Sequence, residues 1–121
     1  MLTFRVEGIP PSYNKHFNIN YNFKQVYLSP EAHSFKNRVK MSIPPATVTT
    51  ASNYKVEIEY HYDFKYKNGR NRKIDLQNMD KLLIDAVFEK LGVDDSYLWE
   101  LQEIKVQDDK ESYTIVNIQQ L

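Results

Sequence analysis

The chain has 121 residues, no Cys, and 16 basic against 16 acidic residues. This length predicts one domain over residues 1–121, and the lack of Cys excludes disulfides, a thiol nucleophile and Cys-ligated zinc or iron–sulfur sites. No stretch approaches the roughly 18 to 20 apolar residues of a membrane span, and residues 1–20 hold no apolar signal-peptide core, so we expect a soluble, cytoplasmic protein that does not bind membranes.

The zero net charge is the sum of two oppositely charged halves. Residues 1–73 contain twelve Lys or Arg and five Asp or Glu, a charge of +7, whereas residues 74–121 contain four and eleven, a charge of −7. A basic region suits a polyanion and an acidic region suits a cation, so the pattern is compatible with nucleic-acid chemistry. Chance clustering in a short chain is the alternative interpretation.

Alternation of apolar and polar side chains over residues 2–6 predicts a first strand, which ends at a Gly-Ile-Pro-Pro turn. Residues 12–24 are polar and rich in Asn and aromatic side chains, which predicts a long loop. Asn14 and Lys15 in this loop are candidate contacts for phosphates and unstacked bases. The alternative is a surface hairpin whose aromatic side chains cover the core.

The Ser-Pro-Glu run at residues 29–31 is typical of a helix start, and the helix must end before Pro44. Strict alternation over residues 54–64 then predicts a long strand with one solvent-facing side. His61 falls on the polar side, without a second His or Cys at ligand spacing, so we assign it no metal or catalytic role.

A basic loop follows at residues 65–73, with five positive charges, no acid and a turn signal in the middle. Loops of this composition suit contact with the phosphate backbone. Its candidate DNA-binding residues are Lys67, Arg70, Arg72 and Lys73.

Apolar residues at helical spacing predict a second helix from residue 76 to 91, which ends at a glycine. Its unusually wide apolar arc indicates cover on two sides, with a second subunit as one candidate. Residues 98–106 and 113–118 are predicted to form an antiparallel hairpin. The order strand, helix, strand, helix, strand, strand predicts an α/β to α+β fold, with a mixed sheet of about four strands and at least one parallel pair.

Acidic residues lie at both ends of the second predicted helix. Asp75 precedes it, and Asp94 and Asp95 follow it. Converging carboxylates would bind Mg²⁺, but a helix of about fourteen residues holds its ends about 20 Å apart, so convergence requires the chain to fold back. Each acid has an ordinary explanation as a helix cap or a turn residue, and Lys81 as an exposed helix lysine. The chain has no Walker loop and no GxGxxG, so we expect no nucleotide cofactor.

Several short motifs occur together in the order of a known family. The chain has DLQNMDK at residues 75–81, DA at 85–86 and LGVDD at 91–95, preceded by PPSYNK at 10–15 and SPE at 29–31 with FK at 35–36. The set resembles the RusA family of Holliday-junction resolvases, whose pattern is Asp-x-Asp-Asn-x-x-Lys, a helix and an Asp-Asp pair after a Pro-Pro-Ser-x-Asn opening. The resemblance covers about residues 4–107.

The resemblance implies a homodimeric, Mg²⁺-dependent endonuclease that binds four-way DNA junctions and cuts symmetrically opposed strands, with Mn²⁺ as a substitute ion. By position it implies metal ligands at Asp75 and Asp95, with Gln77 and Asp94 as further candidates. Asp75, Asp95 and Lys81 are then the catalytic residues, with Lys81 near the scissile phosphate.

Gln77 departs from the family pattern, because it stands where the family has its second aspartate. An amide offers one carbonyl oxygen and no charge, so it is a weaker Mg²⁺ ligand than a carboxylate. Asp94 or Asp80 would then supply the missing charge, or the protein binds branched DNA and cuts it poorly. A third interpretation, a small dimeric protein-interaction domain, follows from the zero net charge and the nine Tyr.

Overall fold

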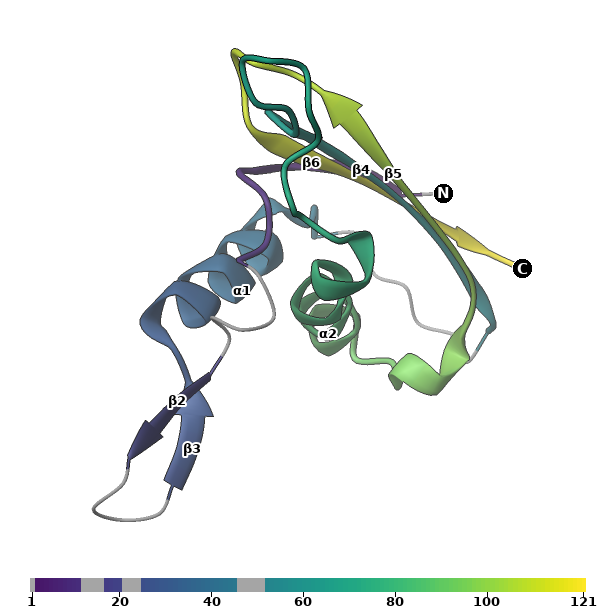
Figure 1. Cartoon of the computed structure of the whole chain (residues 1–121). Coiled ribbons are helices and arrows are strands. Elements are labelled where there is room, and N and C mark those ends of the chain that lie inside the picture. Colours follow the sequence, from purple (N-terminus) through teal and green to yellow (C-terminus); the bar gives the residue numbers. More distant parts are fainter. Residues whose placement is uncertain (1, 12–16, 21–24, 46–51) are drawn as a thin grey trace.

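The computed structural model describes residues 2–11, 17–20, 25–45 and 52–121. Their elements follow the chain in this order (Figure 1): β1 (Leu2–Glu7), β2 (Phe17–Asn20), β3 (Gln25–Leu28), α1 (Pro30–Ser42), β4 (Tyr54–Tyr62), the 3-10 turn η2 (Leu76–Asn78), α2 (Asp80–Leu91), the 3-10 turn η3 (Asp95–Tyr97), β5 (Leu98–Gln107) and β6 (Tyr113–Gln120). None of the helices in these ranges is long and apolar enough to cross a membrane.

The main sheet has four strands in the order β1-β6-β4-β5. β6 is antiparallel to both of its neighbours, whereas β4 and β5 are parallel and are connected through α2. The predicted mixed sheet with one parallel pair is therefore confirmed. The predicted hairpin of the last two strands is wrong, because β4 lies between them and supplies the hydrogen bonds that each would have given the other.

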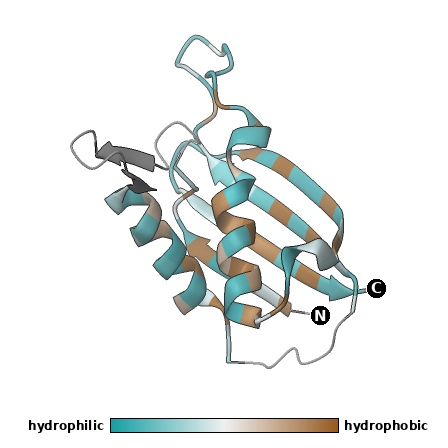
Figure 2. Ribbon diagram, turned by 90° about the horizontal axis from the view of Figure 1, so that it is seen from below, coloured by the Kyte–Doolittle hydropathy of each residue, from teal (hydrophilic) through white to brown (hydrophobic). Residues whose placement is uncertain are grey.

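Both long helices cover one face of this sheet, so the domain has two layers (Figure 2). The alternation in β4 has the expected result: Tyr54, Val56, Ile58 and Tyr60 are buried beneath the helices. The buried residues of α2 lie against the sheet and α1, and they are Leu82, Leu83, Ala86, Val87 and Phe88. The wide apolar arc of α2 is thus covered within one chain, and a second subunit is not needed to cover it.

Ion pairs connect the two helices at the surface of this layer. Glu89 of α2 accepts from Lys36 at 2.8 Å and from Lys40 at 2.7 Å, both on α1. These two bonds lower the pKa of the Glu89 carboxyl. They connect α1 to α2, the helix that follows η2, at the edge of the apolar packing between them.

Part of the predicted loop at residues 12–24 is β2, which pairs in antiparallel fashion with β3, just after the loop. The hairpin alternative is therefore confirmed in its strand pairing. The candidate contacts Asn14 and Lys15 lie outside the described residues.

The start of α1 has the side-chain cap that its sequence predicts, whereas the start of α2 has no side-chain cap. Ser29 caps α1, since its Oγ accepts from the backbone N of Ala32 at 3.1 Å. The second predicted helix is divided into η2 and α2, which meet at Met79. At its end, Gly92 has φ +70°, a left-handed conformation that favours glycine.

Candidate metal and nucleic-acid site

Asp75 stands exposed at the start of η2. Its side chain accepts no capping hydrogen bond from this described turn, so the carboxylate is not used to hold the turn in place. The segment is held from the other side, because Nζ of Lys105 on β5 donates to the carbonyl of Ile74. β5 therefore fixes the backbone next to Asp75 and leaves its carboxylate in solvent.

Asp94 and Asp95 lie beyond the other end of α2, at the start of η3. Oδ1 of Asp94 accepts from the backbone N of Ser96 at 2.8 Å, and this bond lowers the pKa of the Asp94 carboxyl. α2 has twelve residues, so at about 1.5 Å each it holds its two ends about 18 Å apart. Among the described residues, no three His, Cys, Asp or Glu are grouped to hold a metal. One chain alone does not bring Asp75 to Asp95.

Gln77 and Lys81 lie near Asp75, at the beginning of α2 and far from Asp95. Gln77 is exposed in η2, and Lys81 is exposed in the first turn of α2. Nζ of Lys81 contacts Oδ1 of Asp85 at 3.0 Å, one helical turn later. The pair holds the lysine along the helix, with its side chain 60% exposed.

A second pair of carboxyl groups lies where α2 begins, and the sequence analysis did not identify it. Tyr60, buried in β4, donates its hydroxyl to Oε1 of Glu103 on β5 at 2.8 Å. Glu103 is also hydrogen-bonded to Asp80, the first residue of α2. Two carboxyl groups that share a hydrogen bond must hold a proton between them. Burial and the neighbouring Asp80 raise the pKa of Glu103 to about 7, although the Tyr60 hydroxyl opposes the shift.

Asp80, the alternative source of the missing negative charge, thus lies beside Glu103. The signal for this contact was present in the sequence, since Glu103 occupies a position of β5 that faces the helices. It pairs in register with the buried Ile58 of β4. An acid at such a position needs a partner, but the partner comes from α2 and cannot be assigned without the fold.

The basic loop is a compact turn beyond the end of β4. Lys65 and Asn71 form a bridge across it, and Gly69 turns it with φ +84°. Arg72 is committed to the loop itself, because its Nη1 donates to the carbonyl of Asp63 at 3.0 Å. The other predicted DNA-binding side chains described here, Lys67, Arg70 and Lys73, are exposed.

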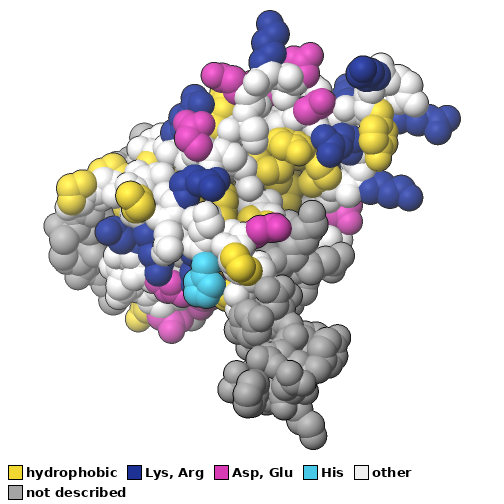
Figure 3. Space-filling model, turned by 90° about the vertical axis from the view of Figure 1, so that its left-hand side faces the viewer, with side chains coloured by type: hydrophobic (Ala, Val, Ile, Leu, Met, Phe, Trp, Pro, Cys, Tyr) yellow, Lys and Arg dark blue, Asp and Glu magenta, His cyan; other side chains and the backbone are white. Residues whose placement is uncertain are grey.

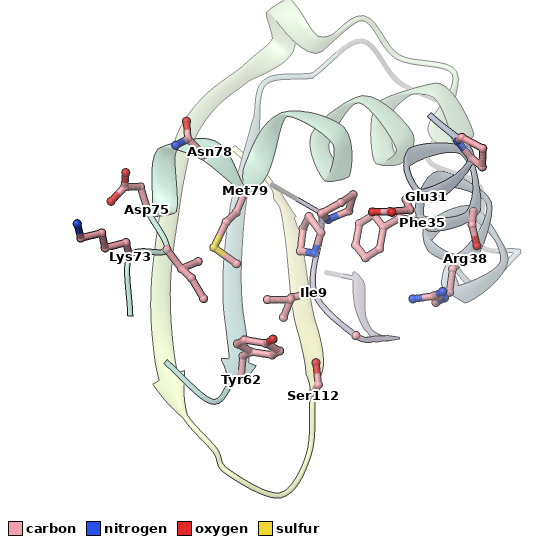
Figure 4. A pocket seen from close by; sticks show the side chains of 16 residues that line it. Ile9, Glu31, Phe35, Arg38, Tyr62, Lys73, Asp75, Asn78, Met79 and Ser112 are labelled. Carbon is pink, nitrogen blue, oxygen red and sulfur yellow. The ribbon is translucent and has the colours of Figure 1, made fainter. Parts of the chain in front are cut away.

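A groove of about 990 Å³ opens beside this region, where the end of β1, the start of α1 and residues 73–79 meet (Figure 4). Lys73 and Asp75 lie together at its outer edge, and Met79 and Tyr62 point into it. An exposed cation, an exposed carboxylate and a hollow therefore adjoin one another.

The family model of the endodeoxyribonuclease RusA matches residues 7–119 of the chain. The protein belongs to the RusA family. The matched range contains every candidate metal and catalytic residue, and the predicted resemblance is confirmed. RusA proteins are Holliday-junction resolvases that act on DNA in recombination, so membership implies a DNA-binding nuclease. A comparison with curated proteins gives no significant match.

Proposed function

We propose that this protein is a Mg²⁺-dependent endonuclease that acts as a homodimer on four-way DNA junctions in the cytoplasm and cuts two symmetric strands. The observation that carries the proposal is the exposed, uncapped carboxylate of Asp75, which stands on a fixed backbone beside the exposed Lys73. An unpaired acid beside cations suits a metal that contacts a phosphate.

The residues present fit Mg²⁺ by their donor atoms. Asp75 and Asp95 offer carboxylate oxygens, and Gln77 and Asp94 add an amide and a second carboxylate, which are the oxygen ligands that Mg²⁺ prefers. When bound, the ion supplies activation of water and neutralises the charge that develops on the leaving oxygen. Mn²⁺ takes similar ligands and is expected to substitute.

The separation of the ligands along α2 supports a dimer. About 18 Å of helix keeps Asp75 from Asp95 of the same chain. A two-fold axis that sets two chains side by side can place Asp75 of one copy next to Asp95 of the other, and it produces two equal sites. A four-way junction also has two-fold symmetry, so two such sites suit the cutting of opposed strands.

The remaining side chains hold the DNA. Lys81, one turn beyond η2, donates to a non-bridging oxygen of the scissile phosphate and offsets its charge. Lys67, Arg70 and Lys73 contact phosphates on either side, and these contacts set the register without reading sequence. Junction selectivity then depends on the shape of the DNA.

Gln77 supports a second candidate function, a branched-DNA-binding protein that cuts weakly or not at all. The amide leaves the metal region one negative charge short of the family pattern. The non-catalytic protein would make the same phosphate contacts as the nuclease, so it would bind junctions equally well and differ only in cleavage.

The deciding experiment is a nicking assay on an end-labelled immobile four-way junction, with the linear duplex of the same sequence as a control. We expect tighter binding to the junction than to the duplex, a strong decrease in affinity with salt, and symmetric nicks only with Mg²⁺ or Mn²⁺. Asp75→Asn should abolish nicking but not binding, and Asp109→Asn, an exposed acid in the β5–β6 turn, should leave both unchanged.

Selective binding without nicks in either ion would establish the non-catalytic function instead. Equal affinity for junction and duplex, or no binding, would contradict both versions. It would leave the protein-interaction domain as the remaining interpretation.

A further inference from the structure

The groove beside Asp75 has an apolar inner wall. Phe35 of α1 and Met79 are each 2% exposed, and Ile9 and Tyr62 pack against the same core. On the face that Figure 3 shows, hydrophobic side chains gather in a patch with Lys and Arg side chains next to it. A hollow with this lining suits a flat, apolar group attached to a negatively charged chain.

Arg38 is fixed at the opposite side of the groove from Asp75 (Figure 4). Its Nη1 donates to the carbonyl of Glu7 at 3.0 Å, and its guanidinium carbon lies 6.0 Å from the centre of the Phe35 ring. Gly8 allows this placement, because a Cβ there would lie 3.1 Å from Nη1 of Arg38. The other N–H groups of the Arg38 guanidinium can donate hydrogen bonds to an acceptor in the groove.

The other polar groups around the groove are suited to the edges of a nucleobase. Glu31 and Ser34, both exposed on the first turns of α1, line it together with Arg38. Arg donates to ring nitrogens and carbonyl oxygens of bases, Glu accepts from their amino groups, and Ser does either. An apolar peptide would pack against the apolar wall of the groove, but it would leave the charges of Arg38 and Glu31 unpaired.

We propose that this groove receives one unpaired base of the junction, from the strand whose phosphate lies at Lys73 and Asp75. The inference rests on the proposed function, since it extends the DNA path from that site. A paired base shows only its edges, so the base must leave its stack to present a face to the half-buried Ile9 and Tyr62. The base must also break its pair, and extrusion costs least where neighbouring base pairs no longer stack on both sides, as at the point of strand exchange.

The test uses a junction with 2-aminopurine, a base whose fluorescence rises when it leaves the stack, next to the cut position. Binding is measured in EDTA, with excitation at a wavelength that Trp does not absorb. We expect the fluorescence to rise with the parent protein. Ser34→Trp fills the groove, so it should lose most of the rise and cut about tenfold more slowly, because one stacked base is no longer held. Asn37→Trp, one turn along α1 and outside the groove, should match the parent.

A junction with an abasic residue at the same position tests the inference from the DNA side. Without a base to hold, the parent and Ser34→Trp should cut at the same reduced rate. A parent that binds and cuts junctions without any rise in fluorescence, or a Ser34→Trp protein indistinguishable from the parent, would overturn the groove assignment and leave the nuclease intact. A parent with no preference for junctions would instead overturn the proposed function.

Discussion

At the scale of single residues, Gln77 is the neutral member of the proposed metal site. It is exposed in η2, two residues after Asp75, so a carboxylate in its place would meet no packing obstacle. A carboxylate at this position would add one negative charge to the proposed site. The neutral amide should therefore weaken Mg²⁺ binding without altering the fold.

Gln77→Asp should lower the Mg²⁺ concentration for half-maximal nicking, by about tenfold if the new carboxylate becomes a ligand. Nicking rates at a series of Mg²⁺ concentrations measure the change. Gln102→Asp adds the same charge at an exposed position of β5 and is the control. An unchanged or higher Mg²⁺ requirement in Gln77→Asp would show that another acid already completes the site.

At the same scale, the motifs predicted Asp75, Asp95 and Lys81 as individual residues, and the length of the predicted helix already indicated about 20 Å between the two acids. The sequence places the two acids at the ends of a helix, and the structure shows no fold-back that would bring them together. Glu103 was missed because its partners, Tyr60 and Asp80, come from two other elements. Pairwise contacts of this kind depend on the order of the strands.

At the scale of elements, the bond between α2 and β5 depends on a proton. Neutral Glu103 can donate to Asp80, whereas ionised Glu103 repels it. Its pKa is raised from an ordinary 4.5 to about 7 by burial and by Asp80. The unfolded chain therefore loses this proton near pH 4.5 and the folded chain near pH 7, so the group's contribution to stability decreases between these values as pH rises.

Glu103→Gln should remove this decrease, since an amide donates to Asp80 and accepts from Tyr60 at any pH. We expect the variant to be more stable than the parent at pH 8 by about 1 kcal/mol, less than the full pKa shift would give because the side chain is partly exposed. At pH 5 the two should be similar. Urea unfolding at both pH values measures this, with the exposed Glu111→Gln as the control. Equal stability at pH 8 would show that the pair does not couple to folding.

The elements themselves were largely predictable, but their neighbours were not. Period-two alternation located β1 and β4 to within about two residues, because one face of each is buried, and the turn-rich residues 108–112 located β5 and β6 equally well. Alternation carries no information on which strands pair, so β5 and β6 were assigned to each other. The partner of the wide apolar arc of α2 was equally unpredictable, because the sequence could not show that α1 packs against it.

At the scale of the whole molecule, the fold mixes the basic and acidic halves of the sequence. β4, from the basic half, lies between β5 and β6, from the acidic half. On the open face of the sheet, Nζ of Lys55 therefore lies 3.1 Å from Glu57 and 3.8 Å from Glu100. The basic loop lies beyond the sheet and keeps exposed cations, so the phosphate-binding surface is expected there and not on the open face.

In the proposed dimer, two copies of the chain complete each metal site, with Asp75 from one and Asp95 from the other. The most direct test mixes the Asp75→Asn and Asp95→Asn proteins under conditions that exchange subunits. A mixed dimer then has one site with both substitutions and one with neither. Each variant alone should bind junctions and fail to nick them.

The mixture should regain nicking, to about a quarter of the parent rate if half of the dimers are mixed and each keeps one intact site. If both ligands came from the same chain, every site in a mixed dimer would carry one substitution and no activity would return. An inactive mixture of variants that exchange subunits and bind junctions, beside a parent that cuts, would contradict the shared site.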